Sequence, residues 1–171
     1  GCNKGIGKEI LKIFSVNGAK VFACVREIDE KFNAEITNLK RKNNSEIIPI
    51  SFDLLNEDQI KESAKKILTL NPNIDILVNN AGAIETALFQ MTSSKKLKEI
   101  FEVNLFSQIT LTQFILKSMI KNKSGSIINI SSISGLDANV GRSAYSASKS
   151  ALITQSKALS KEVGEHNVRV N

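Results

Sequence analysis

Apolar and polar positions follow two periods along the chain. Short apolar runs predict buried strands at 20–25, 47–52, 74–78, 126–130 and 168–171. Between these runs, apolar residues recur at helical spacing over 6–16, 27–40, 56–70, 93–121 and 143–163. Strands that alternate with helices in this way predict an α/β fold with a parallel sheet and right-handed crossovers.

Polar or glycine-rich clusters follow several of the predicted strands. They are Val25-Arg26, Asp53, Asn79-Asn80-Ala81-Gly82 and Ser131-Ser132. Ligands of open parallel sheets bind beyond the carboxyl ends of the strands, where such clusters meet. The sequence therefore predicts one ligand site along this edge of the sheet.

The chain opens with a glycine-rich loop, Gly1-Cys2-Asn3-Lys4-Gly5-Ile6-Gly7, that leads into the first predicted helix. Unpaired N–H groups at a helix start favour an anion, and glycine lets a phosphate approach closely. A P-loop is the obvious alternative. It fails at two positions, because Cys2 stands where its first glycine should be and Glu9 where its metal-binding hydroxyl should be.

The stretch from Ser132 to Lys149 carries the candidate chemistry. If a helix begins near Ser143, Tyr145 and Lys149 share one of its faces, because they are four residues apart. An ammonium beside a phenol favours the phenolate, which makes proton transfer easier at neutral pH. An isolated Tyr–Lys pair of this kind is more often a solvated helix edge, so the interpretation depends on the rest of the chain.

Composition narrows the class of protein. The net charge is +6, but lysines stand among acidic residues and aromatic residues are sparse, which favours a solvated basic surface over a nucleic-acid site. One histidine and two cysteines without metal-ligand spacing predict no metal site, and Cys2 and Cys24 are interpreted as packing residues in a reducing cytoplasm. No apolar run is long enough to cross a bilayer.

Together these motifs resemble the short-chain dehydrogenase/reductase family, in particular its 3-oxoacyl-carrier-protein reductase subgroup. The motifs that carry the resemblance are Gly1-x-x-x-Gly5-Ile6-Gly7, Asp53, Asn79-Asn80-Ala81-Gly82, Val103-Asn104, Ile130-Ser131-Ser132 and Tyr145-x-x-x-Lys149. The resemblance implies a Rossmann-type, doubly wound parallel sheet in three α/β/α layers, with residues 1–171 as a single NAD(P)-binding domain. The family's first strand and its C-terminal segment are not in this sequence, so we expect a fragment truncated at both ends.

The resemblance also implies roles for individual residues. Tyr145 would be the acid or base at the carbonyl oxygen, Ser132 would stabilise that oxygen, and Lys149 would tune Tyr145 and hold the nicotinamide ribose. Asn104 would anchor a water that relays protons to Lys149. The residues implied for cofactor binding are Gly1, Lys4, Gly5, Ile6, Gly7, Arg26, Asp53, Leu54, Asn80, Ala81, Gly82, Tyr145 and Lys149.

Charge guides the choice of cofactor. Members that prefer NAD place an acidic residue at the end of the second family strand, whereas here Val25 and Arg26 stand there, and Lys4 lies in the glycine loop. These cations favour NADP(H) over NAD(H), although Arg26 as a solvated strand end, with Glu27 beside it, stays an open alternative.

The resulting hypothesis is an NADPH-dependent reductase of ketones, with 3-oxoacyl thioesters on an acyl carrier protein as the leading substrates. A ketone of a sugar or other small metabolite is the alternative within this class, and a non-catalytic nucleotide-binding scaffold is the alternative outside it. In the loop before Tyr145, the side chains of Asp137, Asn139 and Arg142 are equally compatible with substrate contact and with solvation. The long helices over 93–121 and 143–163 suggest a homodimer or homotetramer.

Overall fold

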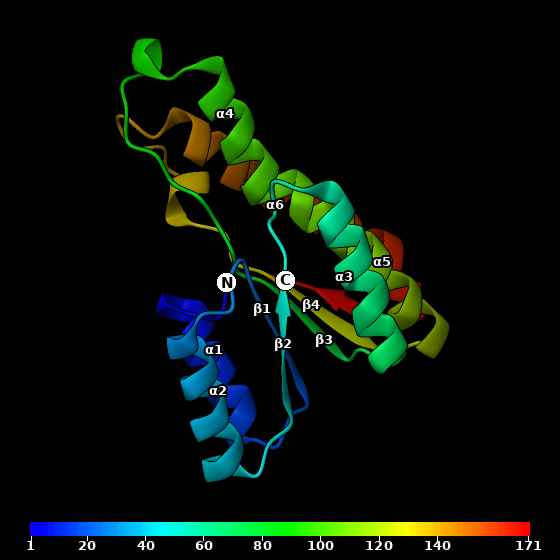
Figure 1. Ribbon diagram of the computed structural model, residues 1–171. Helices are drawn as coiled ribbons and strands as arrows, with labels where there is room; N and C mark the ends of the chain where they lie inside the picture. The colour runs from blue at the N-terminus through cyan, green and yellow to red at the C-terminus, as the bar shows by residue number, and fades with distance from the viewer.

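The strands form two parallel groups that lie beside each other (Figure 1). The computed structural model describes all 171 residues. Its strands are β1 (Val21–Val25), β2 (Ile47–Ser51), β3 (Ile76–Asn79), β4 (Gly125–Asn129) and β5 (Val168–Val170). One group has the order β1-β2 and the other β3-β4-β5, and all neighbours are parallel.

The first two residues of the chain connect the two groups of strands. The Cys2 N–H donates to the Cys24 carbonyl in β1 at 3.3 Å. The side-chain amide of Asn80, directly after β3, donates to the Gly1 carbonyl at 3.2 Å. The glycine loop therefore starts between the carboxyl ends of β1 and β3.

Helices cover both faces of the strands. The α-helices are α1 (Gly5–Val16), α2 (Glu30–Asn43), α3 (Glu57–Leu70), α4 (Ser94–Phe101), α5 (Ser107–Asn122) and α6 (Ser143–Val163). Shorter helical turns are η1 (Phe89–Met91), η2 (Glu102–Phe106), η3 (Ile133–Gly135) and η4 (Gly164–His166). In Figure 1, α1 and α2 lie together beside β1 and β2, whereas α4 extends beyond the sheet.

Alternate residues of β1 separate the two layers of helices. Ala23 and Val25 belong to a core with residues of α1 and α2, such as Leu11 and Phe32. Phe22 and Cys24 pack instead against the larger core that α3 and α5 build. Because successive side chains of a strand point to opposite faces, the helices cover both faces, and the predicted three-layer α/β/α architecture is confirmed.

Two predicted boundaries differ from the structure. Helix α2 begins at Glu30 rather than at residue 27, because the Asp29 carboxylate accepts from the Phe32 N–H at 2.7 Å and caps the helix there. The long segment over 93–121 is divided into α4 and α5 by η2, a π-helical turn with Asn104 at its centre. Such turns are frequent at functional sites.

A ladder of buried amides and hydroxyls crosses the sheet just before the candidate site. The Asn79 side-chain amide donates to Thr112 Oγ1 on α5 at 3.0 Å and to Asn129 Oδ1 on β4 at 2.8 Å. The Asn129 amide in turn donates to Ser156 Oγ on α6 at 2.7 Å. These bonds tie β3 to α5 and β4 to α6 on one face of the sheet, so the carboxyl ends of both strands are held firmly.

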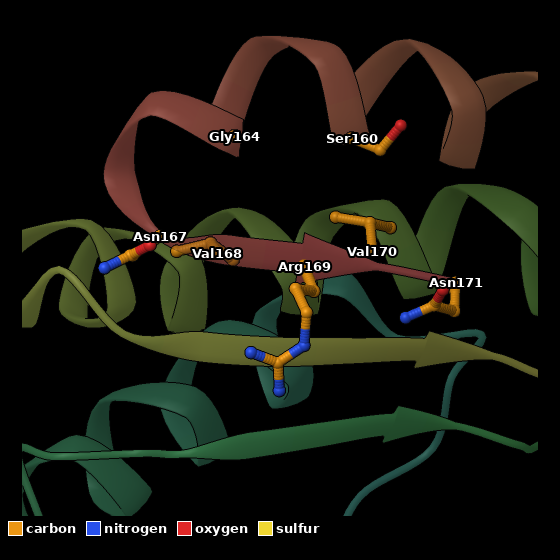
Figure 2. Close-up of a pocket in the computed structure, with 7 residues that line it drawn as sticks. All are labelled: Ser160, Gly164, Asn167, Val168, Arg169, Val170 and Asn171. Carbon is orange, nitrogen blue, oxygen red and sulfur yellow. The ribbon is translucent and has the colours of Figure 1, made fainter.

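The outer edge of β5 borders an open hollow of about 390 Å³ between this strand and the end of α6. Figure 2 shows Ser160 and Gly164 on the helix above the strand, and the Arg169 side chain extending away from them across β4. The hollow contains none of the predicted site residues. No helix in the structure has the length and apolar character needed to span a membrane.

Candidate active site

Ser132 lies where β4 leads into the turn η3. Its Oγ accepts the Ser134 N–H at 3.1 Å, which leaves the hydroxyl hydrogen available to donate. The Ser132 side chain is therefore held by its acceptor side and can still stabilise an oxygen in front of it. Asn139, one of the loop residues considered for substrate contact, donates to Ser134 Oγ at 3.3 Å and helps to hold this turn.

Tyr145 and Lys149 lie one turn apart on α6, whose bounds agree with the predicted helix. Lys149 is 3% exposed, and its ammonium donates to the Ile130 carbonyl at 2.7 Å. Burial lowers the pKa of Lys149 from its usual value of 10.5. Because no carboxylate forms an ion pair with it, the ammonium is a concentrated positive charge beside the end of β4.

Two further contacts fasten the end of β4 to α6. Ser131 Oγ donates to the Lys149 carbonyl at 3.1 Å. Gly135 in η3 lies against the helix so closely that a Cβ there would be 2.9 Å from the Lys149 carbonyl carbon and 3.0 Å from the Ser150 nitrogen. The strand end that carries Ser132 and the helix that carries Tyr145 and Lys149 are thus one rigid unit.

Asn104 is fully buried, and its side chain is held from two directions. Its Oδ1 accepts the Ala83 N–H at 2.7 Å, and its Nδ2 donates to the Ala83 carbonyl at 2.9 Å and to Ser148 Oγ at 3.0 Å. The amide therefore links the loop after β3 with α6. A Cβ on the intervening Gly82 would lie 3.3 Å from Asn104 Oδ1 and 3.7 Å from Lys149 Nζ, so the three residues meet at one point.

The glycine loop and the start of α1 fit a bound dinucleotide phosphate. Lys4 stands at the N-cap position and makes no side-chain cap, so the first-turn N–H groups stay available to an anion. Gly5 has φ +54°, a conformation that favours glycine. Gly7 packs so tightly that a Cβ would lie 2.0 Å from the Gly1 carbonyl oxygen.

The residues expected around the adenosine half lie at the ends of β1 and β2. Arg26 is exposed and has no ion-pair partner. Asp53 accepts the Leu55 N–H at 2.9 Å, and the Leu54 carbonyl accepts a hydrogen bond from Ser107 on α5. Arg26 thus follows β1, Asp53 and Leu54 follow β2, and Asn80-Ala81-Gly82 follows β3.

Cys24 lies in β1, whose carboxyl end borders this edge. Burial raises the pKa of Cys24 to about 12, so its thiol stays protonated at neutral pH and acts as a packing group. No group of three or more His, Cys, Asp or Glu side chains is placed to hold a metal ion.

Three residues that contact and hold the candidate site residues or their loops were not identified from the sequence. Gln108 donates to the Ala81 carbonyl at 2.7 Å, Ser148 bonds Asn104, and Gly135 permits the close approach of η3 to α6. Gln108, like Asn104, is a polar residue within an apolar helical segment, and that pattern is the signal that could have found it. No local pattern marks Gly135, because the contact that leaves no room for a side chain there is with α6, which comes later in the sequence.

Comparison with known proteins gives a consistent picture. The family model described as short chain dehydrogenase matches residues 1–171. Carbonyl reductase family member 4 of Xenopus tropicalis is 36% identical over all of this chain and 70% of its own length. A 3-oxoacyl-(acyl-carrier-protein) reductase of Chlamydia muridarum is 37% identical over all of this chain and 68% of its own length.

Solved structures agree with this assignment. A metagenomic short-chain oxidoreductase in complex with NADP superimposes with a TM-score of 0.95 at 30% sequence identity, covering 100% of this chain and 76% of that one. The present chain spans as little as 61% of another solved short-chain dehydrogenase.

Replacing Gly135 tests the close approach of η3 to α6. We expect Gly135→Ala to lower the free energy of unfolding by about 1–3 kcal/mol, because the new methyl group would overlap the α6 backbone. Gly164→Ala is the control, since a Cβ there meets nothing within 4 Å and its φ is −58°. Urea denaturation measures both. Equal stability of the two variants would contradict the packing described here.

The buried ammonium predicts a pH dependence of stability. Because the folded-state pKa of Lys149 lies below 10.5, the unfolded chain binds more protons between these two values. Stability from this residue therefore rises with pH across that window. In urea denaturation at a series of pH values, the free energy of unfolding of the native protein should rise relative to that of Lys149→Met as the pH approaches 10.5. A constant difference would show that burial leaves the pKa unchanged.

Proposed function

The chain belongs to the short-chain dehydrogenase family, and we propose that its activity is the NADPH-dependent reduction of a ketone to a secondary alcohol. The observation that carries the proposal is the fastening of Ser132, on the end of β4, to the helix that bears Tyr145 and the buried Lys149. On this arrangement we base the proposal that the Ser132 and Tyr145 hydroxyls act on one carbonyl oxygen, with the Lys149 ammonium beside them. A scaffold that only binds a nucleotide has no need to bury an unpaired ammonium there.

The chemistry needs a hydride at the carbonyl carbon and a proton at the carbonyl oxygen. A nicotinamide dinucleotide bound along this edge supplies the hydride. Ser132 donates a hydrogen bond to the carbonyl oxygen and stabilises the negative charge that develops there. Tyr145 gives its phenolic proton to the same oxygen, which completes the alcohol and leaves a phenolate.

Lys149 stabilises that phenolate through its charge, one helical turn away. Its ammonium is fixed by the Ile130 carbonyl at 2.7 Å and lies near Gly82, and we propose that it also holds the nicotinamide ribose. Asn104 holds the adjoining loop through Ala83. The Nδ2 of Asn104 already donates two hydrogen bonds. The water proposed to relay protons to Lys149 would therefore be held by the free lone pair of Asn104 Oδ1 or by the backbone of Asn104.

The loops that flank the site favour an apolar substrate. Exposed large apolar side chains gather on the segments 84–91 and 133–140. The two segments are connected by a hydrogen bond from the Ala87 N–H to the carbonyl of Gly141, directly after the second segment, at 2.9 Å. The apolar side chains are Ile84, Leu88, Phe89, Met91, Ile133, Leu136 and Val140. Such a rim suits an acyl chain better than a hydroxylated sugar. We therefore propose a 3-oxoacyl thioester, the substrate named for the similar Chlamydia reductase, carried by coenzyme or carrier protein.

The proposed preference for NADPH rests on charge. Arg26 is exposed at the end of β1 without an ion-pair partner, and Lys4 lies at the start of α1. A guanidinium suits a 2′-phosphate because it offers several donors in one plane. The NADP complex of the similar metagenomic enzyme supports this preference. Association into a homodimer or homotetramer is part of the same proposal.

Tyr145→Phe tests the proposed acid. We expect NADPH oxidation with a panel of 3-oxoacyl thioesters, sugar ketones and small ketones to fall by about 10²–10⁴-fold, because proton transfer in the transition state is lost. Calorimetric titration should show that the variant still binds NADPH. Unchanged turnover would remove Tyr145 from the mechanism. A native protein that binds NADPH but turns over no ketone would favour the scaffold alternative.

Arg26→Glu tests the cofactor preference. Loss of a charge-assisted hydrogen bond to the 2′-phosphate should weaken NADPH binding by about 10–100-fold, while NADH binding changes far less. Titration of both dinucleotides against both proteins gives the comparison. Glu27→Gln, which removes the neighbouring charge, is the control and should leave NADPH affinity undiminished. Equal NADPH affinity in Arg26→Glu would show that Arg26 is only a solvated strand end.

A further inference from the structure

Gln108 is a buried amide on the first turn of α5, and it touches none of the groups assigned a role in the chemistry. It is 3% exposed. Its Nε2 donates to the Ala81 carbonyl at 2.7 Å and to the Val103 carbonyl at 3.2 Å. Both partners are carbonyls and can only accept, so the orientation of the amide is fixed by its neighbours. Its Oε1 is buried without a hydrogen-bond partner.

Gln108 and Asn104, four residues apart on one stretch of helix, hold the loop after β3 on both sides of Gly82. Asn104 bonds the N–H and the carbonyl of Ala83, and Gln108 bonds the carbonyl of Ala81. We call these two side chains the amide clamp. Between its two points of attachment lies Gly82, whose missing side chain leaves its backbone open near Lys149 Nζ. The clamp therefore decides where this piece of backbone sits.

The second bond of Gln108 connects the clamp to the π-helical turn η2. Val103 and Asn104 both lie within that turn, where the widened helix disrupts the regular backbone pairing. By bonding the Val103 carbonyl, the Gln108 amide links the loop to the turn that orients Asn104. A shift of the loop would therefore have to break bonds at both residues of the clamp.

We propose that Gln108 is a positioning residue for the dinucleotide, acting through the backbone of Ala81 and Gly82. This inference rests on the proposed function, since it concerns how the same site holds its cofactor. Because Gln108 touches the loop and not the reacting groups, its loss alters cofactor affinity more than the rate of the chemical step. An apolar core residue in its place would stabilise the fold without setting the loop, and would take away the donor that the Ala81 carbonyl has in Gln108.

The test compares Gln108→Met with Ser15→Ala. Methionine keeps the length of the side chain and removes both donated bonds. Ser15 is fully buried at the opposite end of α1 from the glycine loop, and its hydroxyl also makes two hydrogen bonds, with Ser45 Oγ at 2.7 Å and Asn43 Nδ2 at 2.9 Å. Ser15→Ala therefore measures the effect of a similar loss of buried hydrogen bonds far from the loop.

For each protein, the Kd for NADPH is measured by calorimetry below its unfolding temperature, and kcat and KM are measured with the ketone that the native enzyme reduces. We expect Gln108→Met to raise Kd and the KM for NADPH by about 10-fold or more, which corresponds to the loss of two hydrogen bonds. The kcat should change by less than about threefold, because the reacting groups are untouched. Ser15→Ala should leave Kd unchanged.

Gln108→Glu keeps the size of the side chain and is the second test variant, to be used if Gln108→Met does not fold. Its carboxylate would face two carbonyl oxygens and repel them, whereas the protonated acid can donate to one of them. NADPH should therefore bind this variant more tightly at about pH 6 than at about pH 8, after correction for the native protein.

The inference is overturned if Gln108→Met and Gln108→Glu bind NADPH as the native protein does, or if Ser15→Ala weakens binding as much. Those results would leave the proposed function intact. A native protein that binds neither NADPH nor NADH would overturn the proposed function, and this inference with it.

Discussion

A buried, unpaired ammonium is the constraint on which the rest of the site depends. Lys149 is almost inaccessible to solvent, and only the Ile130 carbonyl compensates the lost hydration. Such burial is unfavourable for folding. The surrounding contacts offset it by making the location rigid, since Ser131 and Gly135 fasten the strand end to α6. The same contacts hold the strand end that carries Ser132 against the helix that carries Tyr145, so the group that weakens the fold lies where these two elements join.

At β3 and the loop that follows it, the candidate site is held by hydrogen bonds of side-chain amides, not by a charged group. The polar ladder through Asn79 fixes β3, and the amide clamp then fixes the loop that continues from it. Thr112 and Gln108 are on α5 and Asn104 is on the π-helical turn before it, so one helical segment positions both the end of β3 and the loop that follows. Gly82 lies between this system and Lys149. A shift of the amide clamp or of Lys149 would therefore change the surroundings of the same backbone atoms, those of Gly82.

Local sequence signals predicted most of the helices and strands, but not every helix boundary or the turn that divides α4 from α5. Helix α6 has the bounds that were predicted, and α3 begins one residue after the predicted start because Asn56 is its N-cap and accepts the Gln59 N–H. The start of α2 was placed too early, because apolar spacing continues through Ile28 whereas the Asp29 cap decides the boundary. Asn104 was singled out through the family motif, but the π-helical turn around it was not predicted, and the Asn104 side chain bonds a loop that is distant in the sequence.

The sequence by itself determined the fold class, the family and the residue types of the site, because periodicity and motif spacing are local properties that a linear reading captures. Only the tertiary structure decided that Lys149 is buried without an acid partner, that Gly135 must lack a side chain, and that Gln108 completes the hold on the Ala81 carbonyl. Each of these depends on which atoms of distant segments come within contact distance. Burial and hydrogen-bond partners are set by that packing, and residues 81 and 108, or 135 and 149, become neighbours only when the chain is folded.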